Sequence, residues 1–219
     1  MNTRWIETYR DELVERYPAL KPKAEDFFRA AVLLIEAFRQ GKKLLICGNG
    51  GSAADADHIV GELMKSFVVK RPLPEELRNR ILQTDPERGP RIADLLQVGY
   101  PAIALTQHTA LISAYANDAD PVLVYAQQVL GYGREGDVFL GISTSGNSPN
   151  IVDGAIAAKA LGLKVIGLTG AGGGKLRAYC DVCVDVPEKE TYKVQELHLP
   201  VYHGLCLAVE KSLSAAQGI

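Results

Sequence analysis

The chain has 219 residues, of which 47% are hydrophobic and 23% are charged, and its formal net charge is -2 at pH 7. This length and composition predict a single globular domain, residues 1–219, with a sizeable core. The small net charge gives no electrostatic footprint for nucleic acid, so we expect no nucleic-acid partner. The N-terminal region lacks the apolar core of a signal peptide, and no apolar run is long enough to span a bilayer. The composition therefore favours a cytoplasmic protein that has no membrane partner and acts on small molecules.

The first 41 residues show apolar side chains at helical spacing, which predicts two N-terminal helices that end near Gly41. Short apolar runs of the buried-strand type then alternate with helical segments. These runs lie at residues 43–47, 102–105, 138–142, 165–168 and 182–186. The alternation predicts an α/β fold, a doubly wound parallel sheet with helices on both faces.

Two segments depart from this alternation. Residues 67–100 are charged and rich in proline, which predicts an insertion within the domain, with room for short helices. Such a segment can serve as a lid or as a surface used in subunit contacts, and the sequence leaves both open. The last segment, from Thr191 to Ala216, is expected to be one long helix that Pro200 interrupts and kinks.

A glycine-rich loop follows the first apolar run. Asn49, Gly50, Gly51 and Ser52 form this loop, and glycines there let the backbone approach a ligand closely. Ser52 and Asp55 have the spacing of a capping box, so we expect a helix to begin at Ser52. On that helix His58 and Glu62 lie four residues apart and share one face. The strand, loop and helix together are typical of a ligand-binding junction.

A hydroxyl-rich loop follows the third run. Its hydroxyl side chains are Ser143, Thr144, Ser145 and Ser148. Ser148 suits the N-cap and Pro149 the first turn of the next helix, which would place the loop at the positive end of the helix dipole. Loop amides and hydroxyls there predict a phosphate site, although a polar turn with a good cap is the plainer interpretation. Both loops follow strands and should meet at the carboxyl edge of the sheet.

These motifs, together with Gln195-Glu-x-His198, resemble the sugar isomerase (SIS) domain family, and most closely its phosphoheptose isomerase branch. That branch converts sedoheptulose 7-phosphate to a heptose 7-phosphate. The resemblance implies a five-stranded doubly wound sheet and a homotetramer whose active sites lie between subunits.

The resemblance also implies roles for individual residues. Zinc, or another divalent metal, would be held by His58, Glu62, Gln195 and His203, and Glu62 and His203 would be the catalytic pair. The sugar phosphate would be bound by Asn49, Gly50, Gly51, Ser52, Glu62, Asn117, Asp118, Ser143, Thr144, Ser145, Ser148 and Gln195. His198 would support this site or pack beneath it.

The chemistry needs groups of this kind. Aldose–ketose isomerisation moves a proton between neighbouring carbons through an enediol, which requires a base and a group that stabilises the oxyanion. Nitrogen and oxygen ligands suit zinc, although Gln is an uncommon ligand. Gln195 and His203 would lie about 12 Å apart on an ideal helix, so both reach one metal only if it lies between them or the helix kinks.

The chain departs from the family pattern at several positions. Ala53 and Ala54 replace a common His-Cys pair, Ser66 replaces an arginine, and Tyr192 replaces an aspartate. Lys65 would point about 100° away from Ser66 on a continuing helix and is not expected to replace that arginine. These departures bear on the identity of the sugar more than on the chemistry.

Two other functions compete with the isomerase. One SIS relative associates with the bacterial replication initiator without isomerase chemistry and shares the Ser-Ala-Ala sequence found at 52–54, so a sugar-phosphate-binding protein is the alternative. The presence of Glu62 beside His58 favours the enzyme. A nucleotide-binding domain is disfavoured because the glycine loop lacks G-x-G-x-x-G spacing and a P-loop lysine.

Cys180 and Cys183 are expected to be ordinary cysteines at a strand.

Overall fold

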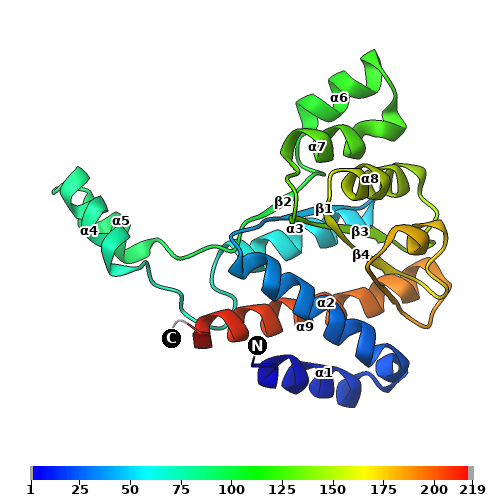
Figure 1. Ribbon diagram of the computed structural model, residues 1–219, viewed down its shortest axis with the longest axis horizontal. Coiled ribbons are helices and arrows are strands. Elements are labelled where there is room, and N and C mark those ends of the chain that lie inside the picture. Colours follow the sequence, from blue (N-terminus) through cyan, green and yellow to red (C-terminus); the bar gives the residue numbers. More distant parts are fainter. Residues whose placement is uncertain (1, 217–219) are drawn as a thin grey trace.

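The computed structural model describes residues 2–216 and contains one five-stranded parallel sheet in the order β2-β1-β3-β4-β5 (Figure 1). The strands are β1 (Leu44–Cys47), β2 (Ala102–Ala104), β3 (Val138–Ser143), β4 (Lys164–Thr169) and β5 (Val182–Asp185). All five coincide with the apolar runs of the sequence to within two residues of each end. The predicted doubly wound α/β fold is therefore confirmed.

Helices cover both faces of this sheet (Figure 1). The first face carries α1 (Arg4–Arg16), α2 (Ala24–Arg39), α3 (Gly51–Met64) and α9 (Thr191–Ala216). The second carries α7 (Val124–Tyr132) and α8 (Pro149–Ala160), with α6 (Thr109–Asp118) beyond α7. Alternate strand residues supply the two cores: Leu44 and Ile46 point into the first, and Leu45 and Cys47 into the second. The strands are buried on both faces, which explains their continuous apolar sequences.

The strand order has its topological switch point between β1 and β3. The chain crosses from β1 to β2 on one side and returns to β3 on the other, and β1 pairs directly with β3 through Leu45 and Phe139. Loops that follow strands on the two sides of a switch point diverge and leave a crevice at the carboxyl edge. The glycine loop follows β1 and the serine loop follows β3, so the fold places the two motifs at this crevice.

Residues 67–100 form an arm that projects from the body of the protein (Figure 1). Its helices are α4 (Glu75–Thr84) and α5 (Gly89–Leu95), which pack against each other. At the base of the arm, the backbone N of Val98 donates to the backbone O of Arg71. The backbone N of Tyr100 donates to Leu63 O at 3.0 Å, which joins the arm to the end of α3. The sequence-based expectation of an insertion with short helices is confirmed.

Short 3-10 helices complete the chain, at Pro18–Lys23, Pro121–Leu123 and Lys175–Tyr179. The predicted long helix from Thr191 to Ala216 is confirmed as α9, and it continues through Pro200 as one element, so the predicted interruption is wrong. Proline removes one backbone hydrogen bond, but α9 packs against α1, α2 and α3, and this packing stabilises the helix on both sides of the proline. Among residues 2–216, we find no helix with the length and apolar character needed to cross a membrane.

Candidate active site

The glycine loop starts α3 one residue earlier than the sequence predicted. Gly50 occupies the N-cap with φ +56°, a left-handed conformation that favours glycine, and the first helical residue is Gly51. The predicted capping box of Ser52 and Asp55 is wrong, because Ser52 lies inside the helix and is only 3% exposed. The first amides of α3 therefore have no side-chain cap and can be offered to a ligand.

Gly51 brings α3 against α9. A Cβ at Gly51 would collide with the side-chain amide of Gln195. The absence of a side chain lets Gln195 lie directly over the start of α3. Gln195 therefore borders the glycine loop, about two helical turns from His203 on α9.

The serine loop opens onto the start of α8. Ser148 is the N-cap and Pro149 the first residue of α8, as the sequence predicted. The Ser148 hydroxyl lies 3.0 Å from the Ser143 hydroxyl and makes no bond to the helix amides. Ser145 Oγ accepts from the backbone N of Asn147 at 3.1 Å. The hydroxyls thus line the loop, and the first-turn amides of α8 have no side-chain cap.

A pair of amide side chains joins the two loops. Asn49 Nδ2 donates to Asn150 Oδ1 at 3.0 Å, and Asn150 Nδ2 donates to Asn49 Oδ1 at 2.9 Å. These residues are 101 positions apart in the chain. The pair confirms that the glycine and serine loops lie side by side at one edge of the sheet. No role for Asn150 was predicted, although an asparagine in the first turn of α8 was a usable signal.

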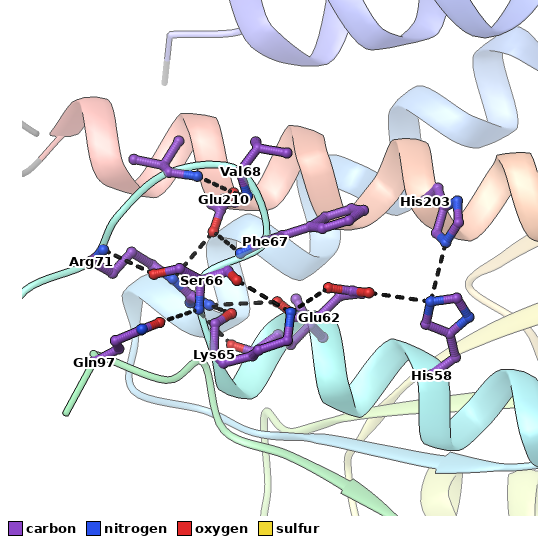
Figure 2. Close-up of polar contacts among 12 residues, drawn as sticks. His58, Glu62, Lys65, Ser66, Phe67, Val68, Arg71, Gln97, His203 and Glu210 are labelled. Carbon is purple, nitrogen blue, oxygen red and sulfur yellow. Dashed lines mark hydrogen bonds and ion pairs between the residues drawn. The ribbon is translucent and has the colours of Figure 1, made fainter. Parts of the chain in front are cut away.

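His58, Glu62 and His203 meet between α3 and α9 (Figure 2). His58 Nε2 lies 3.2 Å from Glu62 Oε1 and 3.4 Å from His203 Nε2. Helical spacing puts His58 and Glu62 on one face of α3, and that face looks toward His203 on α9. The predicted grouping of these three side chains is therefore present within a single chain.

A partly buried chain of hydrogen bonds orients His58. The Tyr202 hydroxyl donates to Asp55 Oδ1 at 3.2 Å and lies 3.1 Å from His58 Nδ1. The single hydrogen of the Tyr202 hydroxyl serves one of these two partners, and the hydroxyl oxygen can accept from Nδ1 when the hydrogen is on Asp55. In either case the contact turns the other ring nitrogen, Nε2, toward Glu62 and His203. Sequence reasoning missed Asp55 and Tyr202 in this role.

The protonation of the surrounding groups follows from burial and charge. Burial, together with the neighbouring His58, lowers the pKa of His203, so this imidazole is neutral at pH 7. Burial raises the pKa of Asp55, and burial and the Asp55 charge raise the pKa of Tyr202. The fully buried His198 has its pKa lowered to about 4, again through burial, against an opposing effect of the Thr169 backbone. Neither ring nitrogen of His198 meets a side-chain or backbone partner with hydrogen-bond geometry.

Lys65 supplies a cation beside Glu62. Its Nζ lies 3.0 Å from Glu62 Oε2 (Figure 2). The two residues are three positions apart, a spacing that brings side chains together at the end of a helix, and α3 ends at Met64 with Lys65 in an extended conformation. The contact does not test whether Lys65 replaces the family arginine, so that point stays a prediction. Ser66, at the position of the family arginine, accepts from the backbone N of Arg71 instead.

Asn117 and Asp118 lie apart from this cluster. Both are exposed at the end of α6, and Asn117 donates to Asp118 at 2.8 Å. The helix α6 packs against α7 and projects from the second face of the sheet (Figure 1). The single chain therefore does not bring these two residues to the loops, and their assignment to the substrate stays a prediction.

The donor set has the chemistry of a divalent-metal site. Within residues 2–216, no group of three or more His, Cys, Asp or Glu side chains has the mutual arrangement needed to hold a metal ion. The two contacts that His58 makes, with Glu62 and His203, nevertheless have lengths close to the ligand–ligand separation around a tetrahedral ion with bonds of about 2.0–2.1 Å. Two imidazole nitrogens and a carboxylate oxygen suit zinc and its neighbours. The residues present fit such an ion in kind, and the two contacts of His58 have the spacing that it needs.

Comparison with known proteins agrees with this geometry. The SIS domain profile matches residues 8–92 and 88–170. The phosphoheptose isomerase of Roseiflexus sp. is 37% identical over 212 residues, which cover 96% of this chain and 94% of that protein. The phosphoheptose isomerase of Aneurinibacillus thermoaerophilus is 39% identical over 185 residues, or 84% of this chain and 80% of that protein.

Solved structures give the same result. A phosphoheptose isomerase from Francisella tularensis superposes with a TM-score of 0.73 at 29% identity and covers 96% of this chain and 100% of that chain. The phosphoheptose isomerase from Neisseria gonorrhoeae superposes with a TM-score of 0.72 at 32% identity. The match covers 94% of this chain and 97% of that chain. The chain therefore belongs to the SIS domain family, among the phosphoheptose isomerases.

Proposed function

We propose that the protein interconverts ketose and aldose phosphates through an enediol, with sedoheptulose 7-phosphate and D-glycero-D-manno-heptose 7-phosphate as the physiological pair. The observation that carries this proposal is the meeting of His58 and Glu62, on the helix that follows the glycine loop, with His203 on α9. The relatives named phosphoheptose isomerase support the same substrate. The alternative, a non-catalytic SIS binding protein, is not favoured, because it has no use for this cluster.

The phosphate binds in the serine loop. The hydroxyls of Ser143 and Ser148, the other loop hydroxyls and the uncapped amides of α8 supply donors at the positive end of the helix dipole. The Asn49–Asn150 pair holds this loop beside the start of α3. His58 lies seven residues beyond Gly51, roughly 10 Å along the helix. A substrate that spans both places carries its phosphate several carbons away from its carbonyl, as a heptose 7-phosphate does.

Glu62 and His203 move the protons. The Glu62 carboxylate removes a proton from C1 of the ketose and returns it to C2, while the neutral His203 transfers a proton between the oxygens on C2 and C1. The charge of the enediolate develops next to these side chains. Each well-placed proton-transfer group contributes on the order of 10²–10⁴-fold. Lys65 holds the second oxygen of Glu62 and so fixes the orientation of the carboxylate.

Zinc, or another divalent ion, would be held by His58, Glu62, Gln195 and His203. When bound, such an ion supplies Lewis-acid polarisation of the substrate carbonyl. The contact of the Tyr202 hydroxyl with His58 Nδ1, which turns Nε2 toward Glu62 and His203, supports this part of the proposal. Gln195 lies against Gly51, so it would join the other three side chains from the glycine-loop side of the site.

A homotetramer with active sites between subunits is part of the proposal. Large apolar side chains are exposed, including Val68 at 57%, Leu95 at 64% and Leu130 at 58%. Asn117 and Asp118 would then reach the sugar phosphate of a neighbouring subunit. We also propose that the enzyme acts in the cytoplasm, which agrees with its four free cysteines.

The test is product formation over a panel of substrates. Purified protein, with and without added zinc, is incubated with ketose phosphates of five, six and seven carbons, and aldose formation is followed by NMR. We expect turnover of sedoheptulose 7-phosphate above the other two. Binding of the sugar phosphates without turnover of any of them would support the binding-protein alternative instead.

A further inference from the structure

Arg71 and Glu210 form an ion pair inside the protein, between the arm and the helix α9. Arg71 Nε lies 3.3 Å from Glu210 Oε1, and each residue is only 1% exposed. This contact is an ion pair without hydrogen-bond geometry, because Arg71 Nε has no acceptor at a suitable angle. The Arg71 guanidinium also stacks 4.3 Å from the centre of the Tyr100 ring. Burying two charges costs free energy unless other bonds satisfy them, so the remaining contacts of the pair matter.

The guanidinium of Arg71 closes the end of α3. It donates to Leu63 O at 3.0 Å and Glu62 O at 3.4 Å, and also to Lys65 O (Figure 2). The last carbonyls of a helix have no partners within the helix, and the planar fork of arginine can reach several of them at once. One of these carbonyls belongs to Glu62 itself.

The Glu210 carboxylate holds the loop that leaves α3. Its oxygens accept from the backbone N of Phe67 and Val68, both at 2.8 Å, and from Val69 at 3.0 Å (Figure 2). Glu210 lies seven residues beyond His203 on α9 and therefore on nearly the same face of that helix. The ion pair thus joins the last turn of the helix that carries Glu62 to the helix that carries His203.

We propose that Arg71 and Glu210 are positioning residues that set the place of Glu62 relative to His203. This inference rests on the proposed proton-transfer roles of those two side chains. Three carbonyls of the α3 end bind the cation and three amides of the next loop bind the anion, so α3 can shift along α9 only if this set of bonds breaks. In the proposed function the phosphate binds in the serine loop, which lies beside the start of α3 and away from its end, so the pair should affect turnover more than substrate binding.

The test uses Arg71→Lys and Glu210→Gln in the full-length protein. Lysine keeps the charge but loses the fork, and glutamine keeps the size but loses the charge. We expect kcat to fall about tenfold or more in each variant, with KM within about twofold of the wild-type value, because small displacements of catalytic groups reduce rates strongly. Hydrogen exchange of the amides of residues 62–69 should become faster. Unchanged kcat in both variants would overturn the proposal.

The matched control is Asp137→Asn. Asp137 is 2% exposed, pairs with Lys43 and accepts from the backbone N of Lys43 and Arg134, but it precedes β3 at the opposite edge of the sheet. We expect this variant to lose thermal stability as Glu210→Gln does while it keeps its kcat. An equal loss of kcat in Asp137→Asn at equal loss of stability would show that Arg71 and Glu210 act through stability alone.

Two further variants, Glu62→Gln and Arg71→Met, separate a failure of the positioning role from a failure of the proposed function. Glu62→Gln tests the proposed function: if it retains the wild-type kcat, the proton-transfer assignment fails and this inference fails with it. If Glu62→Gln is inactive while Arg71→Lys and Glu210→Gln turn over normally, only the positioning role is overturned. If Glu210→Gln does not fold, Arg71→Lys and Arg71→Met test the positioning role instead. We then expect kcat to be highest in the wild type, lower in Arg71→Lys and lowest in Arg71→Met.

Discussion

The Nε2 atoms of His58 and His203 face each other at 3.4 Å, although the residues are 145 positions apart in the chain. Glu62 Oε1 lies 3.2 Å from the same nitrogen of His58, and burial, together with His58, lowers the pKa of His203. Two imidazole nitrogens that approach in this way need a proton or a cation between them. The short distance between these two nitrogens is the reason to expect that a divalent ion binds between His58 and His203.

Zinc should therefore stabilise the protein. An ion that binds only the folded state adds about 2.7 kcal/mol when its concentration is 100 times the dissociation constant. Calorimetric titration of chelator-treated protein and thermal unfolding with and without zinc would measure this. The His58→Gln variant should bind at least tenfold more weakly. Equal zinc affinity in wild type and His58→Gln would contradict the assignment of the site.

Removing the Tyr202 hydroxyl should weaken metal binding and leave the fold intact. Tyr202→Phe deletes the bridge between Asp55 and His58 but keeps the ring that packs beside His203. Loss of such a supporting hydrogen bond typically costs about 10–100-fold in metal affinity. Zinc affinity, measured by competition with a chelating dye, tests this.

Tyr100→Phe is the matched control for that experiment. The Tyr100 hydroxyl is buried and has no hydrogen-bond partner in the described structure. Its removal should leave zinc affinity within about twofold of the wild-type value, since it touches no group of the site. A similar loss in both variants would show that the effect of Tyr202 is not specific to His58.

Ser148→Ala should weaken binding of the phosphate. The hydroxyl lies 3.0 Å from that of Ser143 at the start of α8. A hydrogen bond to a charged group contributes about 1.5–3 kcal/mol, which corresponds to a KM at least tenfold higher with little change in kcat. Steady-state kinetics would show this, with the exposed Ser113→Ala on α6 as the control. An unchanged KM in Ser148→Ala would exclude the serine loop as the phosphate site.

The buried His198 should make the fold sensitive to acid. Its pKa is about 4 in the folded protein and about 6.5 in an unfolded chain, so the unfolded state takes up the proton first. The stability that this neutral histidine contributes is present above about pH 6.5 and is lost as the pH falls toward 4, by roughly 3 kcal/mol. Urea unfolding of wild type and His198→Gln at pH 7 and pH 4 measures it. A pH dependence as steep in the variant as in the wild type would contradict the assignment to His198.

Much of the fold and part of the site could be predicted from the sequence. Strands buried on both faces are continuous apolar runs, and the loops after β1 and β3 have distinctive compositions. The pair His58 and Glu62 follows from helical spacing alone. These features depend on neighbours within a few residues, which is the range that a single sequence reports directly.

The rest depends on contacts between distant segments. The N-cap at Gly50 replaced the predicted capping box because the close approach of Gln195 fixes how α3 begins. The extended backbone of Lys65 depends on where α3 ends, and that end is set by Arg71 and by Glu210, which is more than 140 positions away from it. Tyr202 could be read only as a core residue until the structure placed its hydroxyl between Asp55 and His58.

The most direct test of the central claim is the turnover of sedoheptulose 7-phosphate by the wild type and by Glu62→Gln. Both proteins are compared at equal zinc occupancy, with folding checked by thermal unfolding and aldose 7-phosphate formation followed over time. We predict that the wild type forms the aldose and that kcat of the variant is lower by about 10²–10⁴-fold, with a similar KM. A variant that turns over as fast as the wild type would contradict the account, because no other carboxylate contacts His58 Nε2 in the described structure.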